Sequence, residues 1–274
     1  MKVSVIVTTK NEEKNIKNCL DSIRKQTYPK RNIEILVVDN NSSDRTKELA
    51  KKYTKHVFNK GPERSAQRNF GVSKSSGDYI LYLDADMILH PDVIKKAVAL
   101  VIRNPKIVAL YISEIVIGNS FFAKIRQFER SFYDGTVIDC VRFIKRDIFQ
   151  KVGGFDKSMS GPEDWDLDKK IRARRQTAIL KTPIYHNEST MTLTTYLKKK
   201  KYYSQSFYTY ISKWGKDDAD VKRQFGFYYR FLIVFIEKNK WIKLVQHPLL
   251  FLGMMFLRGL VGITFLQVKM GDHT

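Results

Sequence analysis

The sequence predicts an α/β protein with a mostly parallel sheet covered by helices on both faces, followed by a helical, membrane-associated region. Short apolar segments rich in β-branched residues alternate with segments whose apolar residues recur at helical spacing. The early apolar segments end in Thr, Asn or Asp. A long apolar block lies near the C-terminus. We therefore expect a first region at residues 1–190 and a second at residues 191–274.

The first half of the chain repeats one unit of strand, polar loop and helix. Residues 3–7 and 33–38 predict strands, and each is followed by a polar loop and a helical pattern. A helix over residues 63–73 would place Arg64 and Arg68 one turn apart on one face. Further strands are predicted at residues 107–117 and 139–144, and further helices at residues 121–133 and from residue 91 onward.

The strand predicted at residues 79–83 runs directly into Asp84, Ala85 and Asp86. Acids at i and i+2 of an extended segment project to the same side, so their oxygens can share a hard divalent cation. Such a metal keeps coordination positions for phosphate oxygens. The spacing alone is a weak signal, because a strand that leaves a core often ends in a solvated acid. Its place at the carboxyl edge of an α/β sheet, where ligands bind, favours a functional role.

A second acidic cluster opens the helix predicted to begin near residue 161. Glu163, Asp164, Asp166 and Asp168 surround Trp165. Acids in the first turn interact favourably with the helix dipole, so a structural cap would explain the first two. Four acids exceed what a cap requires, and we therefore expect this turn to belong to a functional site.

The chain is strongly basic, since 49 Lys and Arg against 28 Asp and Glu give 274 residues a formal charge of +21. This charge favours an anionic partner such as nucleic acid, an acidic membrane surface or a phosphorylated substrate. Cys19 and Cys140 lie within predicted elements and lack metal-like spacing. We expect them to be reduced core residues in a cytosolic setting.

The C-terminal region predicts membrane attachment. Lysines at residues 198–201 precede several aromatic residues, and the apolar block at residues 249–266 contains Arg258 as its single charged residue. Its Leu, Ile, Phe and Val residues favour insertion by about 0.3 to 0.6 kcal/mol each, against about 2.5 to 3.5 kcal/mol for a central Arg. The block therefore either spans the bilayer or lies in its interface, and a buried soluble helix is the alternative. The preceding basic residues suit a cytoplasmic, anionic membrane surface.

Four motifs, taken in order, resemble those of family 2 glycosyltransferases with the GT-A fold, especially the branch that includes dolichyl-phosphate-mannose synthase and polyprenyl-linked glycan enzymes. The motifs are residues 7–13, 37–44, 84–86 and 163–166. The resemblance covers residues 2 to about 186. It implies transfer of a hexose, of mannose or glucose type, from a UDP- or GDP-sugar to an acceptor hydroxyl.

The resemblance also implies a nucleotide-sugar site and a divalent cation, Mn²⁺ or Mg²⁺. By matching motifs, the loop after the first strand would line the nucleotide pocket, the acid after the second would contact base or ribose, and two arginines would stand near the diphosphate. The residues implied for donor binding are Thr8, Lys10, Glu12, Asp39, Arg64, Arg68, Asp84 and Ala85.

The residue types fit this chemistry directly. The nucleoside diphosphate of the donor leaves readily only when its developing negative charge is neutralised. A cation bound to Asp86 would neutralise that charge, and Asp84 would hold ribose or a metal-bound water. His186 is a further candidate metal ligand, although a lone histidine after a strand is more often structural. Asp164 is the candidate base for the acceptor hydroxyl, and Glu163 would support it. One displacement assisted by one base inverts the anomeric centre.

The acceptor remains open between several classes. The apolar tail and its basic flank favour a lipid-linked acceptor, either polyprenyl phosphate or a lipid-linked glycan, on the cytoplasmic side of the cell membrane. A soluble or polysaccharide acceptor is the alternative. A basic RNA- or single-stranded-DNA-binding protein is a different class, but the acidic site would repel a phosphate backbone, so no nucleic acid is expected. A sugar nucleotidyltransferase usually has a glycine-rich first loop, whereas residues 8–13 contain no glycine.

Overall fold

The computed structural model describes residues 1–173 and 175–271, which form two compact units. Unit 1 contains Met1–Ile115, Cys140–Lys157 and Glu163–Asn187. Unit 2 contains Val116–Asp139, Ser158–Pro162 and the chain from Glu188 onward. The last junction between the units lies close to the domain boundary expected at residue 190. Unit 2 also takes in two earlier segments, so neither unit is continuous in sequence.

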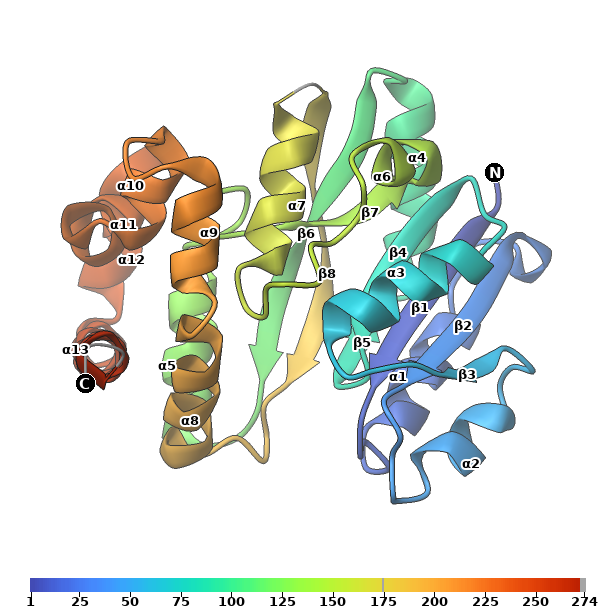
Figure 1. The fold of residues 1–274 in the computed structure, drawn as a ribbon, viewed down its shortest axis with the longest axis horizontal. Helices are drawn as coiled ribbons and strands as arrows, with labels where there is room; N and C mark the ends of the chain where they lie inside the picture. The colour runs from blue at the N-terminus through green and yellow to red at the C-terminus, as the bar shows by residue number, and fades with distance from the viewer. Residues whose placement is uncertain (174, 272–274) are drawn as a thin grey trace. The chain divides into compact units, whose positions relative to one another are not determined.

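Unit 1 is built on a mixed sheet whose first part is parallel (Figure 1). The strand order is β3-β2-β1-β4-β7-β6-β8-β5. The parallel part consists of β1 (Val3–Thr9), β2 (Ile33–Asp39), β3 (Val57–Asn59) and β4 (Tyr79–Asp84). The antiparallel pairs bring in β5 (Met87–Leu89), β6 (Ile107–Ile117), β7 (Val141–Lys145) and β8 (Gln176–Asn187).

The expectation of a mostly parallel sheet therefore holds only for the first four strands. The strands predicted at residues 3–7, 33–38 and 79–83 are present as β1, β2 and β4. The later strands depart from it although helices lie between them in the chain, because an intervening helix permits a parallel crossover but does not require one. Between β6 and β7 the chain passes through unit 2 instead, and β7 then pairs antiparallel with both β4 and β6.

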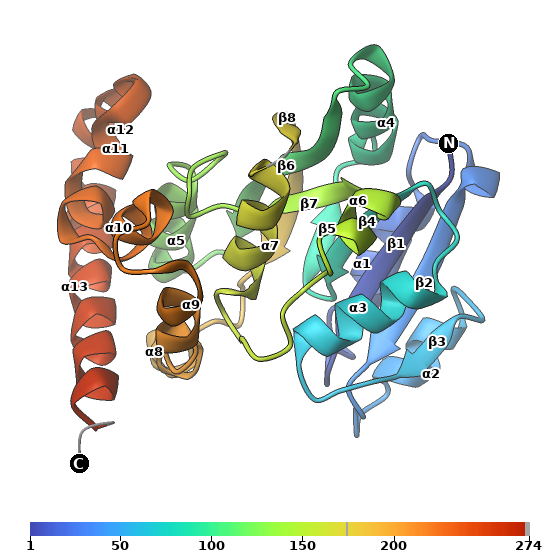
Figure 2. The same cartoon turned by 45° about the horizontal axis from the view of Figure 1, so that its top comes forward.

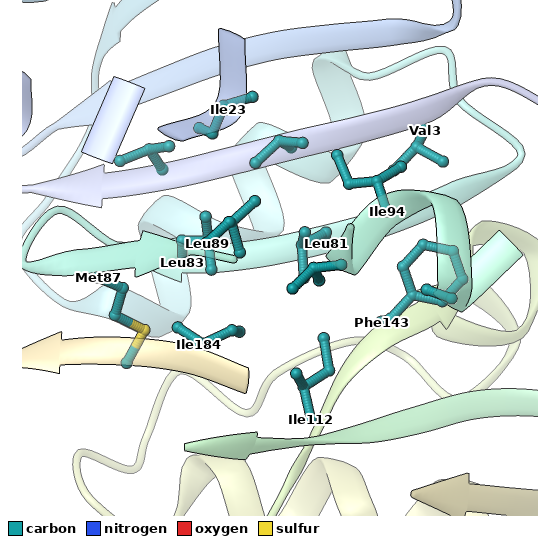
Figure 3. Close-up of a cluster of buried hydrophobic side chains, with 14 of the residues drawn as sticks. Val3, Ile23, Leu81, Leu83, Met87, Leu89, Ile94, Ile112, Phe143 and Ile184 are labelled. Atoms are coloured by element: carbon teal, nitrogen blue, oxygen red, sulfur yellow. The ribbon is translucent and has the colours of Figure 1, made fainter. Parts of the chain in front are cut away.

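Helices cover both faces of this sheet (Figure 2). One face packs against α1 (Ile16–Arg24), α2 (Thr46–Lys51) and α4 (Val93–Arg103). The other packs against α3 (Arg64–Lys74), α6 (Arg146–Lys151) and α7 (Glu163–Arg172). Leu81 and Leu83 of β4 join the first core (Figure 3), whereas Ile80 and Tyr82 join the second. Because β4 is buried on both faces, its polar residues appear only where it ends, at Asp84.

Unit 2 is helical in its described part. Its helices are α5 (Phe121–Arg130), α8 (Leu193–Ser204), α9 (Phe207–Trp214), α10 (Ala219–Phe225), the π-helix η2 (Tyr229–Ile233), α11 (Val234–Ile236), the 3-10 turn η3 (Glu237–Asn239), α12 (Trp241–Gln246) and α13 (Pro248–Gly271). α13 packs against α5, α8 and α12 (Figure 1). Within the described residues, Pro248–Gln267 is the single helical segment long and apolar enough to cross a membrane. In unit 1, Cys19 and Cys140 are buried, as expected, and form no disulfide with any described residue.

Candidate active site

The carboxyl ends of β1, β2 and β4 lie side by side at one edge of the sheet. Thr8 of β1 is in register with Asp84 of β4, and its hydroxyl donates to Asp84 Oδ1 at 3.0 Å. The backbone N–H of Ala85 donates to the Thr8 carbonyl at 3.1 Å. Asp39, which ends β2, is fully buried and accepts hydrogen bonds from the backbone N–H and the hydroxyl of Ser42. In this structure Asp39 therefore holds the loop that follows its own strand.

The loop after β1 carries two more of the predicted donor residues. Lys10 is exposed. Glu12 accepts a hydrogen bond from Asn15 Nδ2 at 2.7 Å, and its backbone N–H donates to Thr46 Oγ1 at 2.8 Å. Asn11 between them has φ of 54°, a left-handed conformation that asparagine tolerates better than most residues. The loop is thus fixed against the loop after β2, with Lys10 left facing solvent.

Arg68 of α3 joins the two acidic motifs. Its Nη2 donates to Asp84 Oδ1 at 3.0 Å, and its Nη1 donates to Asp164 Oδ1 at 2.8 Å. The side chain is 1% exposed, and its guanidinium lies 4.6 Å from the centre of the Tyr82 ring. Burial disfavours the charged guanidinium, but Asp164 and Asp84 outweigh burial and raise the pKa of Arg68. One buried cation therefore sets the spacing between two carboxylates that lie far apart in the sequence.

Arg64, one turn earlier on α3, contacts Asp84 more loosely and pairs with Glu163. Its Nη2 donates to Glu163 Oε1 at 3.2 Å, and its Nη1 lies 3.7 Å from Asp84 Oδ2. Glu163 is 1% exposed, whereas the Asp164 side chain is 20% exposed. Burial and the charge of Asp164 raise the pKa of Glu163, despite the opposing effect of Arg64 and Arg68. Asp164 is therefore the member of the pair that a substrate can reach.

Asp86 faces His186 of β8. Asp86 Oδ2 lies 3.1 Å from His186 Nε2, and His186 Nδ1 lies 2.9 Å from Glu114 Oε1. Glu114 Oε2 in turn accepts a hydrogen bond from Arg142 Nη2 at 3.0 Å. Burial disfavours the imidazolium, but the charge of Asp86 and the hydrogen bonds with both acids outweigh burial and raise the pKa of His186 to about 10. The four side chains form one chain of contacts across β6, β7 and β8.

Sequence reasoning missed Glu114 and Arg142. The available signal was a single acid inside the apolar strand at residues 107–117 and a single arginine inside the strand at residues 139–144. Charges opposite in sign within two buried strands indicate a cross-strand pair. Because the sequence does not show that β6 and β7 are neighbours, that signal could not be used.

The donor atoms present fit a divalent cation at Asp86 and His186, provided that the cation replaces the imidazole proton that Asp86 and Glu114 stabilise in its absence. Asp86 Oδ1 is buried and has no hydrogen-bond partner among the described residues, whereas Thr8 and the two arginines already occupy Asp84. Within the described residues no three His, Cys, Asp or Glu side chains are arranged as a metal centre. A cation here would therefore take its other ligands from phosphate and water, as Mg²⁺ commonly does. Glu114 is placed to orient the His186 ring.

The rest of the acidic turn makes local contacts. Asp166 pairs with Lys170 at 2.9 Å. Asp168 accepts hydrogen bonds from the Tyr111 hydroxyl and from Arg172 Nε, each at 2.6 Å. These contacts of the two acids lie within α7 or reach Tyr111, so Glu163 and Asp164 are left as the candidate functional pair of the turn.

Comparison with known proteins points to one family. Residues 4–159, more than half of the chain, match the model of "Glycosyl transferase family 2". Glycosyltransferase AglE of Haloferax volcanii is 38% identical over 104 residues, which cover 35% of this chain and 34% of AglE. Poly(ribitol-phosphate) beta-N-acetylglucosaminyltransferase TarS of Staphylococcus aureus is 34% identical over 110 residues, which cover 37% of this chain and 19% of TarS. The chain thus matches about a third or less of the length of these relatives.

Solved structures share the fold over the whole chain. The mannosyltransferase PcManGT from Pyrobaculum calidifontis, in complex with GDP-Man and Mn²⁺, aligns with a TM-score of 0.67 at 18% identity and covers 100% of this chain and 88% of that one. TarS residues 1–349 from S. aureus in complex with UDP-GlcNAc align with a TM-score of 0.59 at 17% identity, covering 100% and 92%. These similarities confirm the predicted GT-A fold. With the family model, they show that the chain belongs to glycosyl transferase family 2, whose members transfer a sugar from a nucleotide sugar.

Proposed function

We propose that this enzyme is a metal-dependent, inverting hexosyltransferase. It would transfer a mannose- or glucose-type sugar from a GDP- or UDP-sugar to a lipid-linked acceptor, polyprenyl phosphate or a lipid-linked glycan, at the cytoplasmic face of the cell membrane. The observation that best supports the proposed reaction is that Arg68 donates hydrogen bonds to both Asp84 and Asp164. It brings an acid of the donor motif and the candidate base together at the ligand-binding edge of the sheet.

The donor would lie along the strand ends and the start of α3. Thr8, Lys10, Glu12 and Asp39 belong to the first two strand ends and the loop between β1 and α1. Arg64 is 28% exposed and only 3.7 Å from Asp84. A diphosphate can displace so loose a pair, because guanidinium binds phosphate oxygens in a bidentate manner.

Asp164 would act as the general base. Its Oδ1 is held by Arg68, whereas its Oδ2 has no hydrogen-bond partner among the described residues. With a lipid-linked glycan as acceptor, Oδ2 would accept the proton of the sugar hydroxyl while that oxygen bonds to the anomeric carbon and the nucleoside diphosphate leaves from the opposite face. Polyprenyl phosphate would attack through an ionised phosphate oxygen, which needs no such base. A single displacement of this kind inverts the anomeric configuration. Buried Glu163 would support the site without reaching the acceptor.

Asp86 and His186 would hold the divalent cation, which when bound neutralises charge on the leaving diphosphate. The test is donor affinity, measured by calorimetry with Mn²⁺ and with a chelator. We expect Mn²⁺ to strengthen donor binding by the wild type but not by Asp86→Ala. Asp147→Ala, which removes an acid paired with surface lysines, should behave as the wild type. Wild-type affinity that is equal with Mn²⁺ and with chelator would exclude the metal.

The exposed face of α13 supports a membrane location. Leu249, Leu252, Phe256, Ile263 and Leu266 are 55–72% exposed and recur along one side of the helix. The side that carries Met254, Leu257 and Arg258 is buried. A helix with one apolar exposed face and one face packed on protein fits an interfacial position better than a spanning one.

A transfer assay on the purified protein in detergent tests the function as a whole. UDP- and GDP-sugars are screened with polyprenyl phosphate and with a poly(ribitol-phosphate) acceptor, and the anomeric configuration of the product is determined by NMR. We expect turnover only with the lipid and inversion of the donor configuration. Turnover only with the polymer would instead favour the second candidate acceptor, which the similarity to TarS suggests. A retained configuration would exclude the single displacement.

A further inference from the structure

The helices of unit 2 enclose a group of charged side chains that takes no part in the candidate active site. They come from α5 and the turn after it, from the residue after β8, and from α8, η2 and α13. The members of this cluster are Arg126, Glu129, Tyr133, Glu188, Lys200, Arg230 and Arg258. Glu129, Glu188 and Arg258 are 3–5% exposed, so the cluster is largely removed from water.

Two arginines satisfy the two carboxylates of the cluster. Arg126 donates to Glu188 through Nε and Nη2, each at 3.2 Å, and pairs with Glu129 through Nη1. Arg258 Nη1 donates to Glu129 Oε1 at 2.9 Å, and the Tyr133 hydroxyl donates to the same oxygen at 2.7 Å. Both negative charges are thereby matched by two positive charges.

Arg230 and Lys200 form no ion pair of their own, although the charge of Glu129 acts on both. Neither side chain makes a hydrogen bond or ion pair with any described residue, and Arg230 Nη1 and Arg258 Nε are buried without a partner. Burial, together with repulsion by Arg126, lowers the pKa of Lys200 to about 7. Burial also lowers the pKa of Arg230. Uncompensated charge of this kind is costly inside a protein, so the cluster is complete only with an anion.

We propose that this cluster binds the phosphate group of a ligand. Arg230 and Lys200 are only partly buried, so a ligand can reach them, and guanidinium and ammonium groups together suit phosphate oxygens. Tyr228, Leu232 and Ile233, which flank Arg230 in sequence, are 42–75% exposed. A phosphate attached to an apolar chain therefore fits better than a free one. We assign it to a lipid-linked glycan acceptor, whose phosphate would be held here while a sugar hydroxyl reacts, an assignment that rests on the proposed function.

The test measures binding without donor, using the full-length protein in detergent. Polyprenyl phosphate, the uncharged polyprenol and inorganic phosphate are titrated against the wild type, Arg230→Gln and Lys200→Gln. Lys198→Gln is the matched control, because Lys198 lies on the same helix and is exposed. Thermal unfolding and donor affinity show that each variant is folded.

We expect the wild type to bind polyprenyl phosphate more tightly than polyprenol, and each cluster variant to lose on the order of tenfold in affinity, while the control keeps it. If inorganic phosphate instead bound the wild type as tightly as the lipid does and failed to bind the variants, that result would support a phosphate site but would overturn the lipid as its ligand. Equal lipid binding by wild type and both variants would overturn the site itself. Because no donor is present, these results are independent of the transfer assay, whose failure would refute only the proposed reaction.

Discussion

The two units of this protein differ in how they treat buried charge. In unit 1, Arg68 is buried but pairs with both Asp84 and Asp164. In unit 2, Arg230 and Lys200 lie near Glu129 but form no ion pair with any carboxylate of the described residues. The charge of Arg68 is neutralised within the fold, whereas the charges of Arg230 and Lys200 are not neutralised by an ion pair. The difference shows a unit whose buried cation is paired within the fold and a unit with unpaired positive charge, on which the proposed phosphate site rests.

Their apolar surfaces differ in the same way. Among the described residues, unit 1 exposes only Met1, Ile102 and Ile179 of its large apolar side chains, and all the others that are exposed belong to unit 2. Large exposed apolar surfaces mark interaction sites. Unit 2 therefore combines free positive charge with apolar surface, which are the two properties that an anionic lipid surface would match.

The largest effect is expected in unit 1 from Asp164→Asn. Asparagine keeps an oxygen for Arg68 Nη1 but cannot accept the proton of a sugar hydroxyl, so kcat with a lipid-linked glycan acceptor should fall by about 10²- to 10⁴-fold with donor affinity retained. Steady-state transfer and equilibrium donor binding measure the two separately. Normal turnover by the variant would show that Asp164 is not the base.

The charge balance of unit 1 is tested by Arg68→Met. This change leaves the carboxylates around Arg68 without their buried cation and should lower the free energy of unfolding by about 3 to 5 kcal/mol. Arg103→Met, on the exposed end of α4, should change it by about 0.5 kcal/mol or less. Urea denaturation gives both values. If the two variants proved equally stable, the network around Arg68 would not be a stabilising one.

The apolar surface of unit 2 is tested by Leu252→Ser against Ile102→Ser in unit 1, since the two side chains are 62% and 57% exposed. Loss of one leucine side chain that would become buried in the membrane should weaken binding to anionic vesicles about tenfold, while the unit 1 variant should bind as the wild type. Vesicle co-sedimentation measures this. Equal binding by both variants would remove α13 from the membrane contact.

The smallest effect concerns the unpaired charge of Lys200, which faces Arg126, Glu129, Arg230 and Lys199. Its pKa in the folded protein is about 7, below the ordinary value of 10.5, so between these values the unfolded chain binds more protons and wild-type stability rises with pH. Below pH 7, Lys200 is charged in both the folded and the unfolded state, and burial of that charge lowers the free energy of unfolding by its full amount.

Lys200→Met should therefore be more stable than the wild type at pH 6, with the difference shrinking toward pH 10. Denaturant unfolding at pH 6, 8 and 10 measures this difference, and Lys198→Met is the control. If the stability difference between Lys200→Met and the wild type did not change with pH, the charge of Lys200 would not destabilise the folded protein.

Much of unit 1 could be predicted from local patterns. The apolar segments that became β1, β2 and β4 are short and end in polar residues, and their carboxyl edge was expected to hold the site. The alternation of Leu81 and Leu83 with Ile80 and Tyr82 between two cores follows from a strand period of two residues. The pairing of β7 with β4 could not be predicted, because antiparallel partners can be joined through any long excursion.

The sequence by itself determined the residue types, their order and the local elements that carry them: Asp84 and Asp86 at a strand end, and Glu163 and Asp164 in a first helical turn. Only the tertiary structure decided which charges meet. In the folded protein Asp84 pairs with arginines and Asp86 contacts His186, whereas Arg230 forms no ion pair with a carboxylate of the described residues. Local patterning depends on neighbours within a few residues, whereas pairing of buried charge depends on contacts between distant segments, which chain spacing does not encode.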